Sequence, residues 1–164
     1  MATETPTDIV RRFCAVWSNV NPDEIAEFFT DDATYHDLPV PTDPAVGKAA
    51  IRRKLDFMIA GGVTSMDYAI HHIAVTGADA VLVERTETWH FPSGAAPTLR
   101  VMCTIELRDD KIAAWREYWN GEELMSQMPP EFFEGIERVR HDYDQFERTA
   151  APAGREVYGQ AKRR

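Results

Sequence analysis

Residues 80–91 read AVLVERTETWHF, and this stretch decides the fold class. Its residues fall into two alternating sets: apolar and aromatic residues share one set with Arg85 and Glu87, and the other set is mixed in polarity. Such alternation is typical of a β-strand whose two faces meet different surroundings. The same period runs from Ser65 to Asn120, divided by turn signals at residues 77–79, 92–94 and 109–111. We therefore predict four long strands in an antiparallel meander.

Helical patterns precede this meander. Thr5-Pro6-Thr7-Asp8 is a helix start signal, and apolar residues follow it at helical spacing as far as Val20. Asn21-Pro22-Asp23-Glu24 repeats the signal and predicts a short second helix that includes Phe28 and Phe29 and ends at residues 30–32. Lys48 to about Ile59 forms the third predicted helix, ended by Gly61-Gly62, and its inward residues are Ile51, Leu55 and Met58.

A brief strand is predicted between the second and third helices, at Ala33 to Asp37. The segment that follows, Leu38 to Val46, contains three prolines. Proline lacks the N–H that a strand interior needs, so we predict a loop without regular pairing.

The helical period returns after Asn120-Gly121. Apolar residues at steps of four and three then predict a C-terminal helix that packs on the sheet or on a partner subunit: Phe132, Ile136, Val139, Tyr143 and Phe146. Residues 150–164 are expected to form a loose tail. Helices followed by a meander predict one α+β domain, residues 1–149, with three N-terminal helices on one face of a curved sheet.

Composition narrows the possible partners. The chain carries 18 Lys and Arg against 27 Asp and Glu, a net charge of −9, which would repel phosphate backbones and anionic lipids. Its two cysteines, Cys14 and Cys103, suggest neither a disulfide framework nor a zinc site. We expect a cytoplasmic protein that binds neither nucleic acid nor membrane.

Three strands each bring polar groups beside aromatic ones. Arg85 and Glu87 share a face with Trp89, Glu117 lies between Trp115 and Trp119, and Tyr35 projects with Asp37. If these faces converge, three carboxylates surround one permanent cation, Arg85. One carboxyl should then keep its proton near neutral pH while a neighbour stays ionised, as acid–base catalysis requires.

Each of these residues can also be interpreted as having a purely structural role. Arg85 and Glu87 can form a solvent-facing ion pair, Asp37 can cap a turn, and Tyr35 can be a core aromatic. His71 and His72 are adjacent in a strand and are expected to face opposite ways, so we assign no metal. No cofactor is implied.

Three short motifs resemble the limonene epoxide hydrolase family, within the cone-shaped nuclear transport factor 2-like and SnoaL-like superfamily that includes ketosteroid isomerases. They are Thr34-Tyr35-His36-Asp37-Leu38-Pro39, Val83-Glu84-Arg85-Thr86-Glu87 and Trp115-Arg116-Glu117-Tyr118-Trp119. The resemblance implies a cone-shaped fold and a homodimer. It also implies that Glu117 is the base, Glu87 the acid that protonates the epoxide and Arg85 the bridge, while Tyr35 and Asp37 hold the water.

This chain departs from the family pattern at three of these positions. The family usually has aspartate at the positions of Glu87 and Glu117, and asparagine at that of Asp37. Asp37 also matches the base of ketosteroid isomerase-like proteins and polyketide cyclases, which leaves an isomerase or cyclase open. The chain further resembles the epoxide-opening cyclases of polyether assembly, in which an acid and base pair acts with a substrate hydroxyl in place of water. A non-catalytic ligand carrier is a further alternative, which outward-facing Glu87 and Glu117 would favour.

The aromatic company of the polar groups suggests the kind of substrate. The residues expected to contact a small apolar epoxide are Trp89, Trp115, Trp119, Met58 and Met66.

Overall fold

The computed structural model describes residues 4–40 and 42–150, with side chains as far as residue 140. The leading helical elements are α1 (Pro6–Val16), a 3-10 turn η1 (Trp17–Asn19), α2 (Pro22–Ala26) and α3 (Lys48–Ala60). The strands are β1 (Phe29–Asp37), β2 (Ala45–Val46), β3 (Ser65–Thr76), β4 (Ala80–His90), β5 (Thr98–Arg108) and β6 (Lys111–Trp119). The chain continues through α4 (Gly121–Met125) and α5 (Pro130–Ala150).

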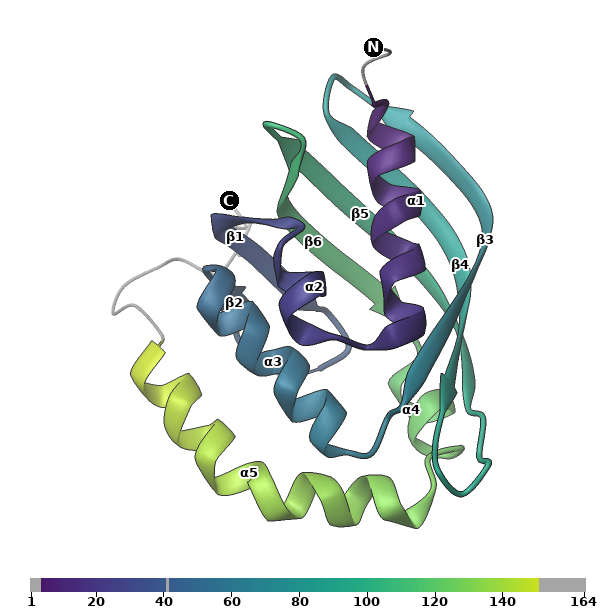
Figure 1. Ribbon diagram of the computed structural model, residues 1–164, viewed down its shortest axis with the longest axis vertical. Coiled ribbons are helices and arrows are strands. Elements are labelled where there is room, and N and C mark those ends of the chain that lie inside the picture. Colours follow the sequence, from purple (N-terminus) through teal and green to yellow (C-terminus); the bar gives the residue numbers. More distant parts are fainter. Residues whose placement is uncertain (1–3, 41, 151–164) are drawn as a thin grey trace, which may run out of the picture.

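One six-stranded sheet has the order β2-β1-β6-β5-β4-β3. Neighbouring strands from β6 to β3 are antiparallel, as the meander predicted, and β1 pairs with β6 in parallel. Helices α1, α2 and α3 lie over one face of this sheet, and α5 runs below α3 across its lower end (Figure 1). The predicted α+β class, curved sheet and helical layer are confirmed, and the parallel pairing of β1 with β6 makes the sheet mixed.

Aromatic rings fill the space between the helices and the sheet. Phe13 of α1 is fully buried and meets Trp17, Phe29 and Trp115 edge-on. Trp17 stacks on Tyr68 of β3, with ring centroids 5.4 Å apart. These contacts fix α1 and η1 above the inner face of the sheet.

The boundary between α2 and β1 differs from the prediction. Helix α2 ends at Ala26, and Phe29 already pairs with Ile112 of β6, so Phe28 and Phe29 are not helical. Phe29 has no exposed surface and packs on Phe13 and Trp115, a burial that the sheet provides and a longer helix would not. The register of β1 shifts between Phe29 and Thr34, where Asp31 and Asp32 are exposed.

The proline-containing loop also ends sooner than predicted. Ala45 and Val46 form β2, which pairs with Tyr35 and Thr34 of β1. The prediction of no regular pairing was therefore wrong for these two residues, because they follow the last proline and keep their N–H groups.

A bulge changes the facing of the two adjacent histidines. The register between β3 and β4 shifts between Ile70 and His72. His71 contacts Thr86 and His72 lies 3.8 Å from Glu84, and both partners belong to the outer face of β4. The prediction of opposite faces was wrong, because the extra residue of the bulge breaks the alternation.

Helix α5 packs closely against the end of α3. A Cβ atom on Gly135 would lie 2.1 Å from the carbonyl oxygen of Ala60, and one on Gly61 would lie 2.5 Å from the ring of Phe132. Tyr143 and Phe146 of the predicted C-terminal helix lie where the structure describes the backbone only. The expected tail lies outside the described residues from position 151 onward. Among the described helices, none is long and apolar enough to cross a bilayer.

Candidate functional site

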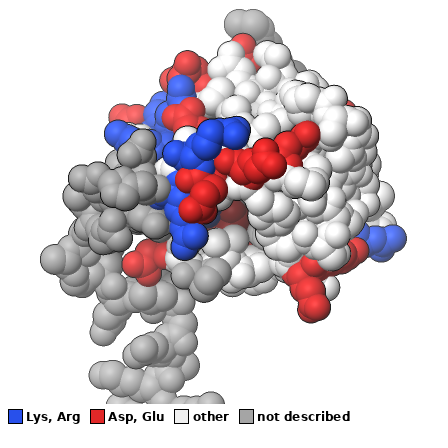
Figure 2. Space-filling view, turned by 90° about the horizontal axis from the view of Figure 1, so that it is seen from below, with Lys and Arg blue, Asp and Glu red and all other residues white. Residues whose placement is uncertain are grey.

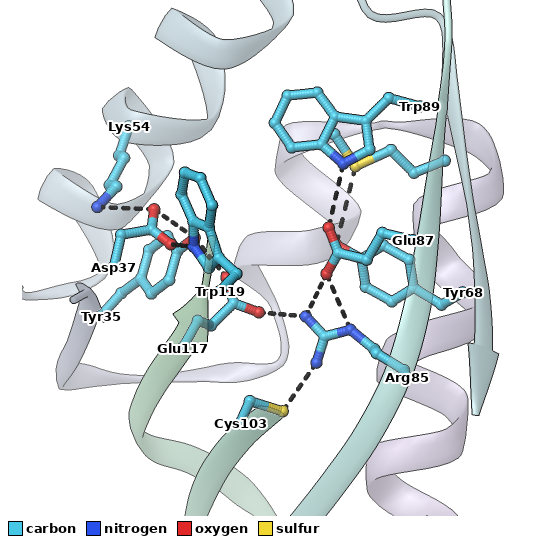
Figure 3. A network of polar contacts seen from close by, with 11 residues as sticks. Tyr35, Asp37, Lys54, Tyr68, Arg85, Glu87, Trp89, Cys103, Glu117 and Trp119 are labelled. Carbon is cyan, nitrogen blue, oxygen red and sulfur yellow. Dashed lines mark hydrogen bonds and ion pairs between the residues drawn. The ribbon is translucent and has the colours of Figure 1, made fainter. Parts of the chain in front are cut away.

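The register of the sheet brings the predicted carboxylates together. Asp37 of β1 pairs with Glu117 of β6, and Glu117 pairs with Cys103 of β5. Arg85 and Glu87 follow on β4, and the side chain of Arg85 reaches across β5 to Glu117 (Figure 3). The inner positions of β5 are small or thin at this point, Val101 and Cys103, so a long arginine side chain has room to cross the strand.

Arg85 is the centre of the buried part of the site. Its side chain has no exposed surface, and its Nε and Nη2 donate to Oε1 of Glu87 at 2.9 and 2.5 Å. Nη2 also donates to Oε1 of Glu117, and Nη1 donates to the sulfur of Cys103 at 2.8 Å. The guanidinium lies 4.5 Å from the ring centroid of Tyr68. Arg85 therefore bridges the two buried glutamates, as the resemblance implied.

Asp37 forms a second cluster at the edge of the site. Its Oδ1 accepts from the indole of Trp119 at 3.0 Å, and its Oδ2 accepts from the hydroxyl of Tyr35 at 2.9 Å. Nζ of Lys54, from α3, lies 3.2 Å from Oδ2 and 4.3 Å from the centroid of the Tyr35 ring. The side chains of Lys54 and Asp37 are 14% and 12% exposed, so this cluster is nearer to solvent than Arg85.

Tyr35 joins the two clusters. Its hydroxyl oxygen lies 2.9 Å from Oδ2 of Asp37 and 3.0 Å from Oε2 of Glu117. Its ring stacks on Trp115 with centroids 4.1 Å apart, which fixes the direction of the hydroxyl.

Burial shifts the titration of the central groups. Burial raises the pKa of Glu117 well above its ordinary value; Arg85 opposes this effect, and the negative charges of Glu87 and Asp37 reinforce it. Burial, together with the negative charge of Asp37, also raises the pKa of Tyr35 well above the usual phenol range. Burial would by itself lower the pKa of Arg85, but Glu87 and Glu117 outweigh it and raise that pKa. The site therefore holds a neutral phenol and a permanently charged guanidinium.

The predicted substrate-contacting residues occupy different depths. Trp89 and Trp119 are half-buried at the ends of β4 and β6, and the indole of Trp89 donates to Oε2 of Glu87 at 3.1 Å. Trp115 and Met66 are almost completely buried, Trp115 beneath Tyr35 and Met66 within 3.8 Å of the Tyr68 hydroxyl. Met58 packs on the edge of the core.

The sequence prediction missed Lys54, Tyr68 and the contact made by Cys103. It counted a single cation among the carboxylates, which was wrong, because Lys54 pairs with Asp37. Lys54 lies three residues after Ile51 and four before Met58, both predicted to face inward, so the helical period itself was the missed signal. Tyr68 and Cys103 hold inward positions of β3 and β5 and could have been found from alternation.

The ends of β4 and β6 that carry Trp89 and Trp119 point toward the lower end of the molecule in Figure 1. Viewed from below, this end shows basic and acidic side chains side by side in one band, with acidic atoms set back in a hollow beside it (Figure 2). A separate surface hollow of about 660 Å³ lies between α2 and α3, lined mainly by charged residues such as Asp23, Lys48 and Arg52. None of the residues of the Arg85 or Asp37 clusters lines that hollow.

Comparison with known proteins gives a family and a set of similar structures. The sequence model of the SnoaL-like domain matches residues 10–115. A protein from Catenulispora acidiphila with a ketosteroid isomerase-like fold, solved with trimethylamine, is 21% identical, with a TM-score of 0.65 over 76% of this chain and 94% of that one.

Two further structures carry enzyme descriptions. An LEH-like epoxide hydrolase from M. tuberculosis is 23% identical, with a TM-score of 0.62 over 84% of this chain and 96% of that one. SalBIII, an epoxide hydrolase/cyclase-like enzyme of pyran ring formation in the polyether salinomycin, is 20% identical, with a TM-score of 0.62 over 72% and 92%. At these identities the structures establish a shared fold.

Proposed function

The chain belongs to the SnoaL-like domain family, and from this premise we propose that it opens a lipophilic epoxide by acid–base catalysis without a cofactor. One observation carries the proposal: the fully buried Arg85 bridges Glu87 and Glu117 beside Tyr35 and Asp37. Carboxyl groups that share one cation in a weakly hydrated site cannot all ionise at low cost, so a proton donor and a proton acceptor coexist there.

Opening an epoxide needs those two functions at once. An acid protonates the ring oxygen as the C–O bond breaks, and a base removes a proton from the attacking water. Ring strain makes the C–O bond reactive, and no metal or redox step is required. Resemblance assigns the base to Glu117 and the acid to Glu87, with Tyr35 and Asp37 as the groups that hold the water.

An apolar substrate fits the surroundings of the carboxylates. The indole N–H groups of Trp89 and Trp119 are both engaged by carboxylates, which leaves their half-buried rings to contact an apolar body. Met58, at the edge of the core, is a further proposed contact. Trp115 and Met66 are almost completely buried, so we propose that they act from beneath, by supporting Tyr35 and Tyr68.

The test is turnover of a panel of epoxides by the purified protein. Wild type should form diols, and Glu117→Gln should reduce diol formation by at least about 100-fold, the usual contribution of a positioned acid or base. Glu84→Gln is the matched control, because Glu84 lies on the outer face of the same strand as Arg85 and should leave turnover unchanged. Diol formation by Glu117→Gln at the wild-type rate would contradict the proposal.

A second candidate function is isomerisation or cyclisation with Asp37 as the base. The ion pair between Asp37 and Lys54 favours it, because a carboxylate held beside an ammonium group can remove a proton next to a carbonyl. The same preparation tests this candidate: hydrogen exchange on enolisable ketones, lost in Asp37→Asn, with no diol from any epoxide would favour it. In a variant of the first candidate, epoxide opening, a hydroxyl group of the substrate attacks the ring carbon in place of water.

Other expectations from the sequence stay proposals. Glu87 and Glu117 face inward, which supports an enzyme over a simple ligand carrier. A homodimer, a cytoplasmic location and the lack of nucleic acid and membrane partners are proposed on resemblance, sequence and charge.

A further inference from the structure

The hydroxyl of Tyr35 has one proton and two carboxyl neighbours. It lies 2.9 Å from Oδ2 of Asp37 and 3.0 Å from Oε2 of Glu117, both hydrogen-bond distances. A neutral phenol donates once, and an ionised carboxylate only accepts. Two ionised neighbours would therefore leave one carboxylate oxygen facing a phenol lone pair, so one of the two carboxyls carries a proton.

The other partners of Asp37 indicate that it is ionised. Lys54 and the indole of Trp119 both point donors at its oxygens, and Tyr35 supplies a third. Three donors, one of them charged, stabilise a carboxylate. His36, the preceding residue, adds no positive charge near neutral pH, because burial and Lys54 lower its pKa.

Glu117 has a different set of partners. Its Oε1 accepts from Arg85, but Arg85 also donates twice to Glu87, which already balances the guanidinium charge. Its Oε2 lies within hydrogen-bond distance of the Tyr35 hydroxyl. The neighbouring Cys103 is a neutral thiol, because burial raises the pKa of that thiol to about 12. A proton on Oε2 would be donated to Tyr35, and every contact of the cluster would then have one donor and one acceptor.

We infer that Glu117 is the proton donor of the site and that Asp37, kept ionised by Lys54, is the base. This rests on the proposed epoxide opening and reverses the role that the resemblance gives to Glu117. The charges balance as two ion pairs, Lys54 with Asp37 and Arg85 with Glu87, around one neutral acid.

The reaction then proceeds with all atoms accounted for. Water attacks a ring carbon, the C–O bond of that carbon breaks, the ring oxygen takes the proton of Glu117, and Asp37 takes a proton from the water. The product is the diol, with Asp37 protonated and Glu117 ionised. Tyr35 then gives its proton to Glu117 and receives one from Asp37, which restores the starting state without bulk solvent.

Carbon-13 NMR of carboxyl groups tests this placement directly, because protonated and ionised carboxyls resonate at different positions. Protein labelled at the glutamate Cδ and aspartate Cγ atoms is used, and Glu117→Gln, Glu87→Gln and Asp37→Asn serve to assign the three resonances. In the wild type at neutral pH, Glu117 should resonate as a protonated acid and Asp37 and Glu87 as carboxylates. An ionised Glu117 beside a protonated Glu87 would overturn the inference.

The role of Lys54 has its own readout in the same spectra. Lys54→Met should move the Asp37 resonance toward the protonated position at neutral pH, and Lys54→Arg should keep it at the carboxylate position. A merely structural lysine would leave the Asp37 resonance in place in Lys54→Met, which would contradict its role.

The two proposals fail in distinguishable ways. A protonated Glu117 in a protein that turns over none of the epoxides would reject the proposed function and leave the proton placement standing. Diol formation by a protein whose Glu117 is ionised would support the proposed function and reject the proton placement.

Discussion

The site contains two ion-paired groups that differ in their distance from solvent. Arg85 and its glutamates are 0–7% exposed in their side chains, whereas Lys54 and Asp37 are 12–14% exposed. A fully buried cation cannot be left without its partners, because its hydration has been lost, while a cation near the surface can recover water. The comparison predicts that the fold depends more on the ion pairs of Arg85 than on the ion pair between Lys54 and Asp37.

The largest expected effect is on stability in Arg85→Met. Removing the guanidinium leaves Glu87 buried without its counter-ion and Glu117 without the donor to its Oε1, which should lower the free energy of unfolding by about 3–5 kcal/mol. Urea denaturation at neutral pH measures it. Arg108→Met is the control, because Arg108 pairs with Asp32 at an exposed position and should cost less than about 1 kcal/mol. Equal losses in the two variants would remove the distinction between the buried and the exposed ion pairs.

The second effect is the pH dependence that Glu117 gives to stability. Burial raises the pKa of Glu117 in the folded protein above the ordinary value of 4.5, so the folded state holds this proton more tightly than the unfolded chain. Stability from this group is complete below the unfolded value and is lost as the pH rises through the folded pKa, by up to about 1.4 kcal/mol per pH unit. Glu117→Gln should therefore lose less stability than wild type as the pH rises.

Urea denaturation at several pH values above 4.5 measures that difference in slope. Glu84→Gln, on the outer face of β4, should keep the wild-type slope. A wild-type slope in Glu117→Gln would mean that another group binds the proton, and would weaken the contrast between Glu117 and the less deeply buried Asp37.

The two clusters also differ in how far the sequence predicted them. Arg85, Glu87 and Glu117 lie in regular strands, where alternation alone assigns the face and the meander supplies the neighbours. The helical period places Lys54 on the inward side of α3, but its pairing with Asp37 could not be predicted, because the strand of Asp37 meets α3 only in the tertiary structure. The early start of β1 and the bulge at His71 were missed for the same reason, since packing of Phe29 and pairing of β3 with β4 override the local pattern.

The smallest expected effect is the coupling between Lys54 and Asp37. A double-mutant cycle of Lys54→Met, Asp37→Asn and the double variant isolates it, because each change removes one charge of the pair. We expect a coupling of roughly 1 kcal/mol, above that of an exposed pair and below that of a buried one, because both side chains retain some contact with solvent. The matched cycle on Arg12 and Glu4, which are 56% and 40% exposed, should give no more than a few tenths of a kcal/mol. If the two coupling energies are equal, Lys54 stabilises Asp37 no more strongly than an exposed partner would. The difference in stability between the two clusters would then come from Arg85 alone.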